Sequence, residues 1–216
     1  MRYSAEHIQR TRARILREAL RLFRQRGYQG ASIDDVMAAA KLTRGSFYHH
    51  FDSKEALFAE VFRLGGNDFV GKLEARRATT PEGLVDEAVG IARAYLAPEN
   101  RDIVRQGCPL AALPVDAARC GELVRAAFGE KLSALAGEMQ RGSPRSDDDL
   151  SRALAAIALC IGGVVLSSAV ADKDLADKLS RACQDAAENA LRSGADAQSD
   201  ATPLRRKERP KPRRNS

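Results

Sequence analysis

Residues 43–55 read Thr43-Arg44-Gly45-Ser46-Phe47-Tyr48-His49-His50-Phe51-Asp52-Ser53-Lys54-Glu55, and this stretch decides the fold of the first part of the chain. Phe47 and Phe51 are four residues apart, so they share one face of a helix. The other side carries Arg, Ser, Tyr and His side chains. The pattern predicts a short helix, a stop at Asp52-Ser53, and a new helix after it. A helix that is apolar on one side and lined with donors on the other fits a groove of DNA.

The residues before this stretch predict two further helices. A long amphipathic helix is expected from Ser4 to Arg26, with Gly27 ending it at the C′ position. Ser32 and Asp35 have the spacing of a capping box, which starts a second helix. A very short turn at Lys41-Leu42 then leads to Thr43, the expected N-cap of the third helix. Two short helices joined by such a turn and braced by a long one form a helix-turn-helix arrangement.

The remainder of the chain also reads as helical. Ala is abundant, β-branched runs are rare and Trp is absent, which favours an all-α protein. Thr80-Pro81 begins a helix that is expected to reach about residue 97, and a break at 107–109 precedes a short segment to 118. Three more helices are expected, at about 121–141, 148–171 and 173–192. The predicted domains are a three-helix head at 1–64, a larger helical body at 65–193, and a disordered basic tail at 194–216.

Charge is unevenly distributed along the 216 residues. Residues 1–64 hold 12 Lys and Arg against 7 Asp and Glu, a net charge of +5. Residues 65–203 hold 16 against 21, a net charge of −5, and residues 204–216 hold 7 against 1, a net charge of +6. Charged helix surfaces are common in any protein, but a basic head beside an acidic body indicates a polyanion partner at one end.

Other classes of protein find little support in the sequence. No apolar run is long enough to span a bilayer, because Ala153–Val170 is interrupted by Gly and Ser, and no secretory signal follows the basic N-terminus. The cysteines at 108, 120, 160 and 183 lack the spacing of a metal site, and no His lies beyond residue 50. We therefore expect a cytoplasmic protein with reduced thiols, no cofactor, no metal and no catalytic constellation.

The head offers the side chains that DNA recognition requires. Arg44 has a fork that can pair with guanine, and Gly45 lets the helix approach closely. Tyr48 is long enough to reach a phosphate, and Lys54 brings a charge to the first turn of the next helix, whose free N–H groups also attract phosphate. The expected DNA-binding set is Ser32, Lys41, Thr43, Arg44, Gly45, Ser46, Tyr48, His49, His50 and Lys54.

Residues 10–62 resemble the DNA-binding head of the TetR/AcrR family of bacterial transcriptional regulators. The matching residues are Ile15-Leu16, Ala19, Leu22-Phe23, Gly27-Tyr28, Ser32-Ile33, Val36, Ala38-Ala39, Ser46-Phe47-Tyr48-His49-His50-Phe51 and Ser53-Lys54-Glu55-Ala56-Leu57. The resemblance implies about nine helices, a dimer built by the last two of them, and a body that binds a small molecule and thereby releases DNA. One departure is Lys41, where the family usually has Gly. A positive φ there would cost roughly 1 kcal/mol relative to Gly, which a phosphate contact by Lys41 could offset.

The body allows two interpretations of its possible sensor residues. The segment Gly107-Cys108-Pro109 resembles one seen in family branches where a thiol senses electrophiles or oxidants, while a free Cys is more often a small buried packing residue. Effector-pocket residues and core residues look alike in sequence. The candidates for the pocket are Phe69, Tyr95, Cys108, Leu113, Phe128 and Leu132.

The last two helices suit a dimer interface, with an internal core helix as the alternative. The expected interface residues are Ile157, Ile161, Val165, Leu175, Leu179 and Ala186. The favoured function is a homodimeric repressor that a small-molecule effector releases from a near-palindromic operator. The rivals are a repressor that senses oxidants through Cys108, a nonspecific DNA-coating protein, and a helical enzyme, for which no acid–base or nucleophilic constellation is visible.

Overall fold

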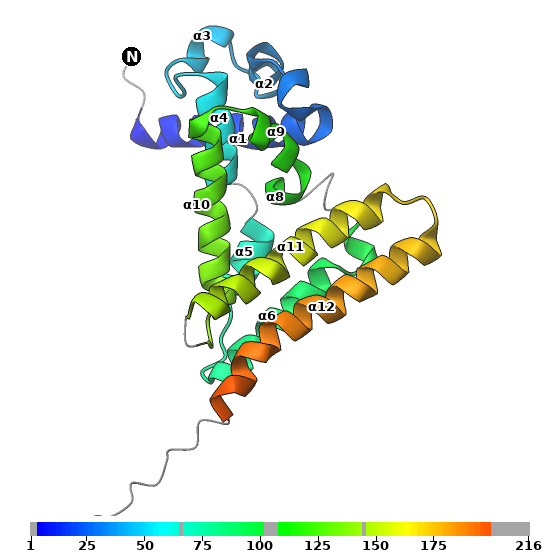
Figure 1. The fold of residues 1–216 in the computed structure, drawn as a ribbon. Helices are drawn as coiled ribbons and strands as arrows, with labels where there is room; N and C mark the ends of the chain where they lie inside the picture. Colours follow the sequence, from blue (N-terminus) through cyan, green and yellow to red (C-terminus); the bar gives the residue numbers. More distant parts are fainter. Residues whose placement is uncertain (1–3, 65–66, 102–107, 144–145, 200–216) are drawn as a thin grey trace, which may run out of the picture.

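The computed structural model describes residues 4–64, 67–101, 108–143 and 146–199, and the regular structure within these ranges is entirely helical (Figure 1). The predicted all-α class is confirmed, and the described ranges hold eleven α-helices where about nine were expected. The elements are α1 (Ala5–Gly30), α2 (Ile33–Ala39), α3 (Arg44–Phe47), α4 (Lys54–Leu64), α5 (Asn67–Glu74), α6 (Pro81–Tyr95), η1 (Pro98–Asn100), α8 (Pro109–Ala112), α9 (Pro114–Arg119), α10 (Glu122–Met139), α11 (Asp147–Ala169) and α12 (Lys173–Ser199).

The head consists of α1 to α4 at one end of the molecule (Figure 1). Ser4 caps α1 by accepting a hydrogen bond from the backbone N–H of His7. The predicted break at Gly27 is present, because its φ of 71° is left-handed, and one more helical turn follows it to Gly30. The predicted capping box of α2 is also confirmed, since Ser32 and Asp35 each accept from the other's backbone N–H.

Aromatic rings fill the middle of the head and continue toward the body. The Phe58 ring of α4 lies 5.0 Å from Phe23 and 4.7 Å from Tyr28, measured between centroids. Phe62 lies 5.1 Å from Phe58 and 5.3 Å from Phe128 of α10. Pairs at these distances add to the free energy of burial, so the row of rings holds α1, α4 and α10 together.

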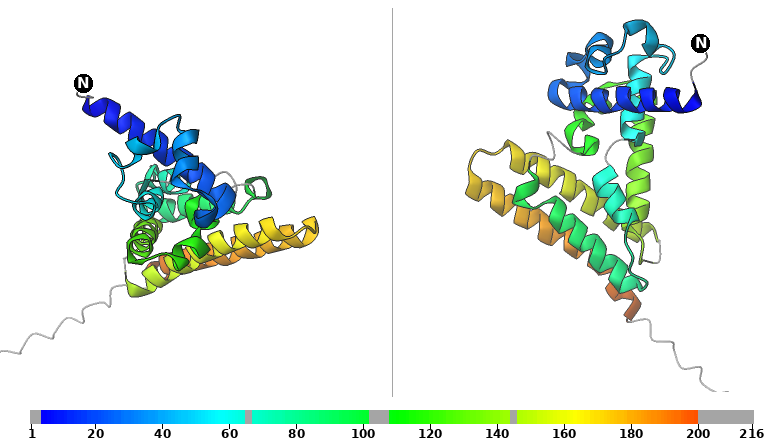
Figure 2. Two further views of the ribbon diagram at one scale, coloured as in Figure 1. Left: turned by 90° about the horizontal axis from the view of Figure 1, so that it is seen from above. Right: turned by 180° about the vertical axis from the view of Figure 1, so that it is seen from behind.

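The body is a layer of long helices on one flank. α11 and α12 form an antiparallel pair, and α6 lies against α12 while α10 runs beside α4 (Figures 1 and 2). Thr80 caps α6 and Pro81 occupies its first turn, as the sequence predicts. Arg93 of α6 forms an ion pair with Glu188 of α12 at the edge of this layer.

A buried arginine closes the end of the body that lies away from the head. Arg76 is 5% exposed, and its guanidinium donates to the backbone carbonyls of Leu73, Leu84 and Glu138. Leu73 and Glu138 lie in the last turns of α5 and α10, where carbonyls lack helical partners. The negative end of each helix favours a cation, so one side chain ties three helices together.

Several predicted boundaries are wrong. The helix expected over residues 43–51 is only the four residues of α3, followed by turns through His50. α5 and η1 were not expected. α12 continues to Ser199, past the predicted start of the tail at 194, because a single Gly194 costs a helix only about 1 kcal/mol. Residues 200–216, which hold the rest of the predicted tail, lie outside the described residues.

Judged by length and composition alone, α11 is long and apolar enough to cross a membrane. The sequence analysis predicted no apolar run of that length. The core helix of a soluble protein passes the same test. Here α11 packs on α12, α10, α6 and α8, which accounts for an apolar residue at most of its positions.

Close packing between α11 and the layer beneath it depends on Gly163. A Cβ placed on Gly163 would lie 2.7 Å from Leu96 Cδ2 and 2.9 Å from Cys183 Sγ, whereas one on Gly162 would meet nothing within 4 Å. Gly163 therefore serves the interior of the protomer, and Gly162 faces outward.

We expect Gly163→Ala to lower the free energy of unfolding by about 1–3 kcal/mol, because the added methyl overpacks this contact. Gly90→Ala in α6 is the matched control: its Cβ has open space, and the better helix propensity of Ala should raise stability by about 1 kcal/mol. Urea unfolding followed by circular dichroism measures both. Equal effects of the two substitutions would contradict the packing role of Gly163.

Candidate DNA-binding surface

The turn between α2 and α3 is a Schellman motif with lysine at its left-handed position. The N–H of Leu42 donates to the Met37 carbonyl at 2.9 Å, and the N–H of Lys41 donates to the Ala38 carbonyl at 3.0 Å. Lys41 has φ of 55°, and no other non-Gly residue in the described chain has a positive φ. The positive φ that the sequence analysis considered for Lys41 is therefore present. This left-handed turn ends α2 and leads the chain into α3.

Phe47 and Phe51 anchor the recognition segment, defined here as residues 43–51. Phe47 is completely buried, Phe51 is 4% exposed, and their ring centroids are 5.8 Å apart. The Arg12 guanidinium of α1 lies 4.5 Å from the Phe51 ring centroid, a cation–π contact that holds the end of the segment against α1. These contacts leave the opposite side of the segment free to meet a ligand.

The outward side of the recognition segment carries the predicted DNA-binding residues. Tyr48 is 55% exposed, although its ring packs edge-on to Phe47 at 5.2 Å. The exposed residues in the segment are Thr43, Arg44, Gly45, Tyr48 and His49. Gly45 has open space around its Cβ position, so an Ala side chain there would meet no other part of the described head. Ser46 is partly buried, and its hydroxyl donates to the Thr43 carbonyl at 3.1 Å.

Arg44 is paired with a carboxylate that the sequence analysis left out of the set. Its Nη1 lies 2.6 Å from Oδ2 of Asp34 in α2, and both side chains are mostly exposed. An arginine that reads a base must give up this partner. Asp34 thus holds Arg44 in place, and any ligand of Arg44 would compete with this ion pair.

Ser32 and Lys54 of the predicted set have structural roles, and Thr43 lacks the capping bond that was expected of it. Ser32 is the N-cap of α2 and donates to Asp35, which lowers the pKa of the Asp35 carboxyl. Thr43 stands at the N-cap position of α3 but makes no side-chain capping bond, contrary to expectation. Lys54 is half-buried, with Nζ 4.3 Å from the Tyr28 ring centroid, and burial lowers its pKa. Lys54 therefore braces α4 against α1 and does not point outward.

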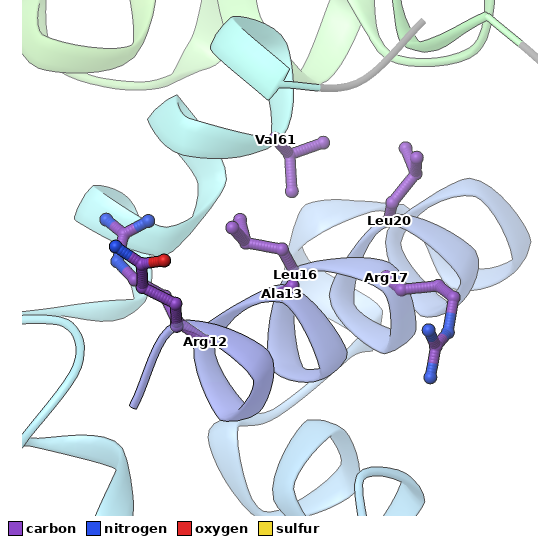
Figure 3. A pocket seen from close by; sticks show the side chains of 7 residues that line it. Arg12, Ala13, Leu16, Arg17, Leu20 and Val61 are labelled. Atoms are coloured by element: carbon purple, nitrogen blue, oxygen red, sulfur yellow. The ribbon is translucent and has the colours of Figure 1, made fainter. Parts of the chain in front are cut away.

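Two hollows lie on the head. The larger, about 610 Å³, opens between the start of α1 and the recognition segment. It is lined by His7, Ile8, Thr11, Leu42, Ser46, His49 and His50. The smaller, about 430 Å³, lies between α1 and α4, where Leu16, Leu20 and Val61 point toward one another and Arg12 and Arg17 stand at its ends (Figure 3).

The predicted effector residues lie in or against the core of the body. Tyr95, Cys108 and Leu113 are buried, Phe128 and Leu132 pack partly buried against the same core, and the side chain of Phe69 lies outside the described residues. The Tyr95 hydroxyl contacts the Cys108 thiol, and burial raises the pKa of both groups. A buried thiol with a raised pKa is a weak nucleophile, so the structure favours packing over sensing for Cys108.

Of the predicted interface residues, Ile157 is misplaced. It is 1% exposed because it belongs to the core of the protomer, and so it cannot meet a partner. Ile161, Val165, Leu179 and Ala186 are partly buried, and Leu175 is 53% exposed. Three exposed leucines of α11, Leu150, Leu154 and Leu166, were missed although they lie on the same helix as the partly buried Ile161 and Val165.

The head and body are joined by hydrogen bonds that the sequence did not indicate. Asp116 of α9 accepts from the backbone N–H of Tyr28 at 3.2 Å, and Glu55 of α4 accepts from the N–H of Gly121 at 3.0 Å. Arg63 of α4 also pairs with Glu130 of α10 at 2.9 Å. Each contact joins residues more than sixty positions apart, which no local sequence pattern reveals.

Comparison with known proteins agrees with this geometry. The sequence profile described as "Bacterial regulatory proteins, tetR family" matches residues 15–61, the segment from the middle of α1 to α4. Residues 15–61 therefore match the DNA-binding head of the TetR family. Residues 15–61 include the turn, the recognition segment and the packed rings of Phe23, Tyr28 and Phe58.

Individual relatives extend the likeness. The HTH-type transcriptional repressor DhaR from Mycobacterium sp. (strain GP1) is 30% identical over 114 residues, 53% of this chain and 56% of that protein. The HTH-type transcriptional regulator AcrR from Shigella flexneri is 41% identical over 73 residues, 34% of each chain. The chain thus matches about half the length of the first relative and a third of the second.

Solved structures show that the fold continues through the body. A TetR-family transcriptional regulator from Cytophaga hutchinsonii superimposes with a TM-score of 0.65, covering 87% of this chain and 96% of that one at 22% identity. At this identity the likeness concerns the fold alone. Among the described residues, no group of three or more His, Cys, Asp or Glu side chains is placed to hold a metal ion.

We expect Asp34→Asn to strengthen DNA binding about two- to fivefold, because an exposed ion pair of about 0.5–1 kcal/mol no longer competes for Arg44. Asp52→Asn removes the same charge elsewhere in the head and serves as the control for net charge. Fluorescence anisotropy with a labelled duplex measures both. Weaker binding by Asp34→Asn would instead mean that Asp34 mainly pre-orients Arg44.

We expect Lys41→Gly to stabilise the protein by roughly 1 kcal/mol, because glycine adopts the left-handed conformation without a Cβ penalty. It should also weaken DNA binding and make the salt dependence of binding less steep by about one ion, if Lys41 contacts a phosphate. Thermal unfolding and anisotropy over a salt series give the two quantities. An unchanged affinity and salt slope would remove the phosphate contact from the interpretation.

Proposed function

We propose that this protein is a homodimeric transcriptional repressor whose two heads bind a near-palindromic DNA operator. The observation that carries the proposal is the recognition segment, which is anchored through Phe47 and Phe51 and exposes donors on its other side. Arg44 is the candidate for base readout, since a guanidinium pairs with guanine in the major groove. Thr43, Tyr48 and His49 are the candidates for phosphate contacts.

The outward face of α11 and α12 supports dimerisation. Leu154 and Leu166 of α11 and Leu175 of α12 are 37%, 56% and 53% exposed, and Gly162 between them leaves room for close approach. Large apolar side chains in a row on a long helix pair form the type of surface that a second copy covers. Joining two copies here would present two heads to successive turns of one DNA face.

Regulation of DNA binding would take place in the body. A small-molecule effector bound in the core near Tyr95, Leu113, Phe128 and Leu132 would shift the dimer toward a state that fits its operator poorly. A protein of this function would act in the cytoplasm. The rival, oxidant sensing through Cys108, has the weaker support because that thiol is buried and its pKa is raised. If oxidants release DNA from the native protein but not from Cys108→Ser, the rival is the better account.

Selection from a random pool of duplexes tests the main proposal. The expected outcome is one enriched near-palindrome, protected from nuclease as a single block. Arg44→Ala should weaken binding to it by about 1–3 kcal/mol per half-site, while binding to unrelated duplexes changes little. Arg77→Ala, at the end of the body away from the head, is the matched loss of one charge. Uniform protection of all duplexes would support a nonspecific DNA-coating protein.

A further inference from the structure

An ion pair between Asp34 and Arg44 spans the turn of the head. Asp34 is the second residue of α2 and Arg44 is the first residue of α3, so the pair joins the two helices on either side of Lys41. Arg44 Nη1 lies 2.6 Å from Asp34 Oδ2, and the two side chains are 62% and 57% exposed. A ligand that reaches the guanidinium of Arg44 therefore also meets the carboxylate of Asp34.

The two acidic residues in the first turn of α2 make different contacts. Asp35 accepts hydrogen bonds from the backbone N–H and the hydroxyl of Ser32, and it lies 3.5 Å from the guanidinium of Arg26. These contacts complete the capping box, and they place a negative charge at the positive end of the helix. Asp34 takes no part in the capping box, and its carboxylate accepts from Arg44 instead. The helix is thus capped without Asp34.

Base readout by Arg44 changes the surroundings of Asp34. The proposed function requires the guanidinium to donate to a guanine, and to do so it leaves the carboxylate. A charged group that loses its partner on binding weakens the complex unless another donor replaces that partner. Asp34 then stands beside the bases with acceptor oxygens and no donor of its own. The nearest base edge decides whether Asp34 adds to affinity or reduces it.

Cytosine is the base whose edge in the major groove suits a carboxylate. It presents its N4 amino group there, from which Asp and Glu accept a hydrogen bond. Guanine presents N7 and O6, and thymine presents O4, all of which are acceptors that repel a carboxylate. Adenine has an acceptor beside its amino group, so it fits less well than cytosine. Repulsion of the wrong bases contributes to discrimination as much as attraction of the right one.

We propose that Asp34 is a specificity-determining residue of this head, which selects cytosine at the base pair next to the guanine that Arg44 reads. The ends of the two side chains lie 2.6 Å apart, and base pairs stack about 3.4 Å apart, so two neighbouring pairs are within their joint reach. The inference rests on the proposed DNA-binding function. It adds a residue of α2 to the groups that read bases.

Two effects of Asp34 on affinity differ in their dependence on sequence. Competition with DNA for Arg44 weakens binding to all duplexes that Arg44 reads, so removing the competition leaves the ratio of affinities between such duplexes unchanged. Acceptance from cytosine changes that ratio at one position. A substitution that only destabilised α2 would act on all duplexes alike, because the free protein is common to every comparison. The ratio therefore isolates base reading by Asp34.

Selection from a random pool, followed by competition binding with single-base variants of the selected duplex, measures this ratio. The native protein should prefer cytosine to guanine or thymine at one position of each half-site by about five- to thirtyfold. Asp34→Ala should reduce that preference to less than about twofold and keep the preference for the neighbouring guanine. Asp34→Asn keeps an acceptor and adds an amide donor, so it should bind guanine and thymine there as well as cytosine.

Asp52→Ala removes an exposed carboxylate elsewhere in the head and is the matched control, which should select the same site as the native protein. Identical base preferences in the native protein and Asp34→Ala would overturn the role of Asp34 and leave the proposed function in place. A selected site without cytosine beside the guanine would overturn that role too. A protein that enriches no duplex would overturn the proposed function itself.

Discussion

The burial of Phe47 is the constraint on which the functional surface depends. α3 has four residues, far fewer than an isolated helix needs to persist in water, so its conformation is set by what it packs against. Phe47 is completely enclosed, Phe51 nearly so, and both belong to the core that contains the row of rings from Phe23 to Phe62. The direction of Arg44 and Tyr48 is therefore fixed by aromatic packing several residues away from them.

The same packing continues into contacts between head and body. Phe62 meets Phe128, and Asp116 and Glu55 each accept a hydrogen bond from a backbone N–H of the facing part of the molecule. Glu55 lies four residues after Phe51, at the start of α4. These bonds join α9 to α1 and the start of α10 to α4. A change in the position of α9 or α10 is felt next to the recognition segment.

The head could be predicted from sequence because its signals are local. Each of these signals is contained in five residues or fewer. They are the capping box of Ser32 and Asp35, the break at Gly27, and the spacing of Phe47 and Phe51. The pairing of Arg44 with Asp34 and the gathering of His7 with His49 join residues ten and forty-two positions apart, and only the folded chain brings them together. In the body, Ile157 and Leu154 have the same apolar character in sequence, and only the packing of α11 separates the buried one from the exposed one.

The distance between the recognition segment and the outward face of α11 and α12 has a genetic consequence. α3, which begins with Arg44, and α11, which carries the exposed Leu154 and Leu166, lie in different parts of the molecule (Figure 1), so damage to one leaves the other intact. In a dimer joined through α11 and α12, a copy with a damaged recognition segment still pairs with an undamaged one. The mixed dimer has one working head and holds a two-sided operator poorly. A defective allele of this kind would therefore act dominantly over the normal one in the same cell.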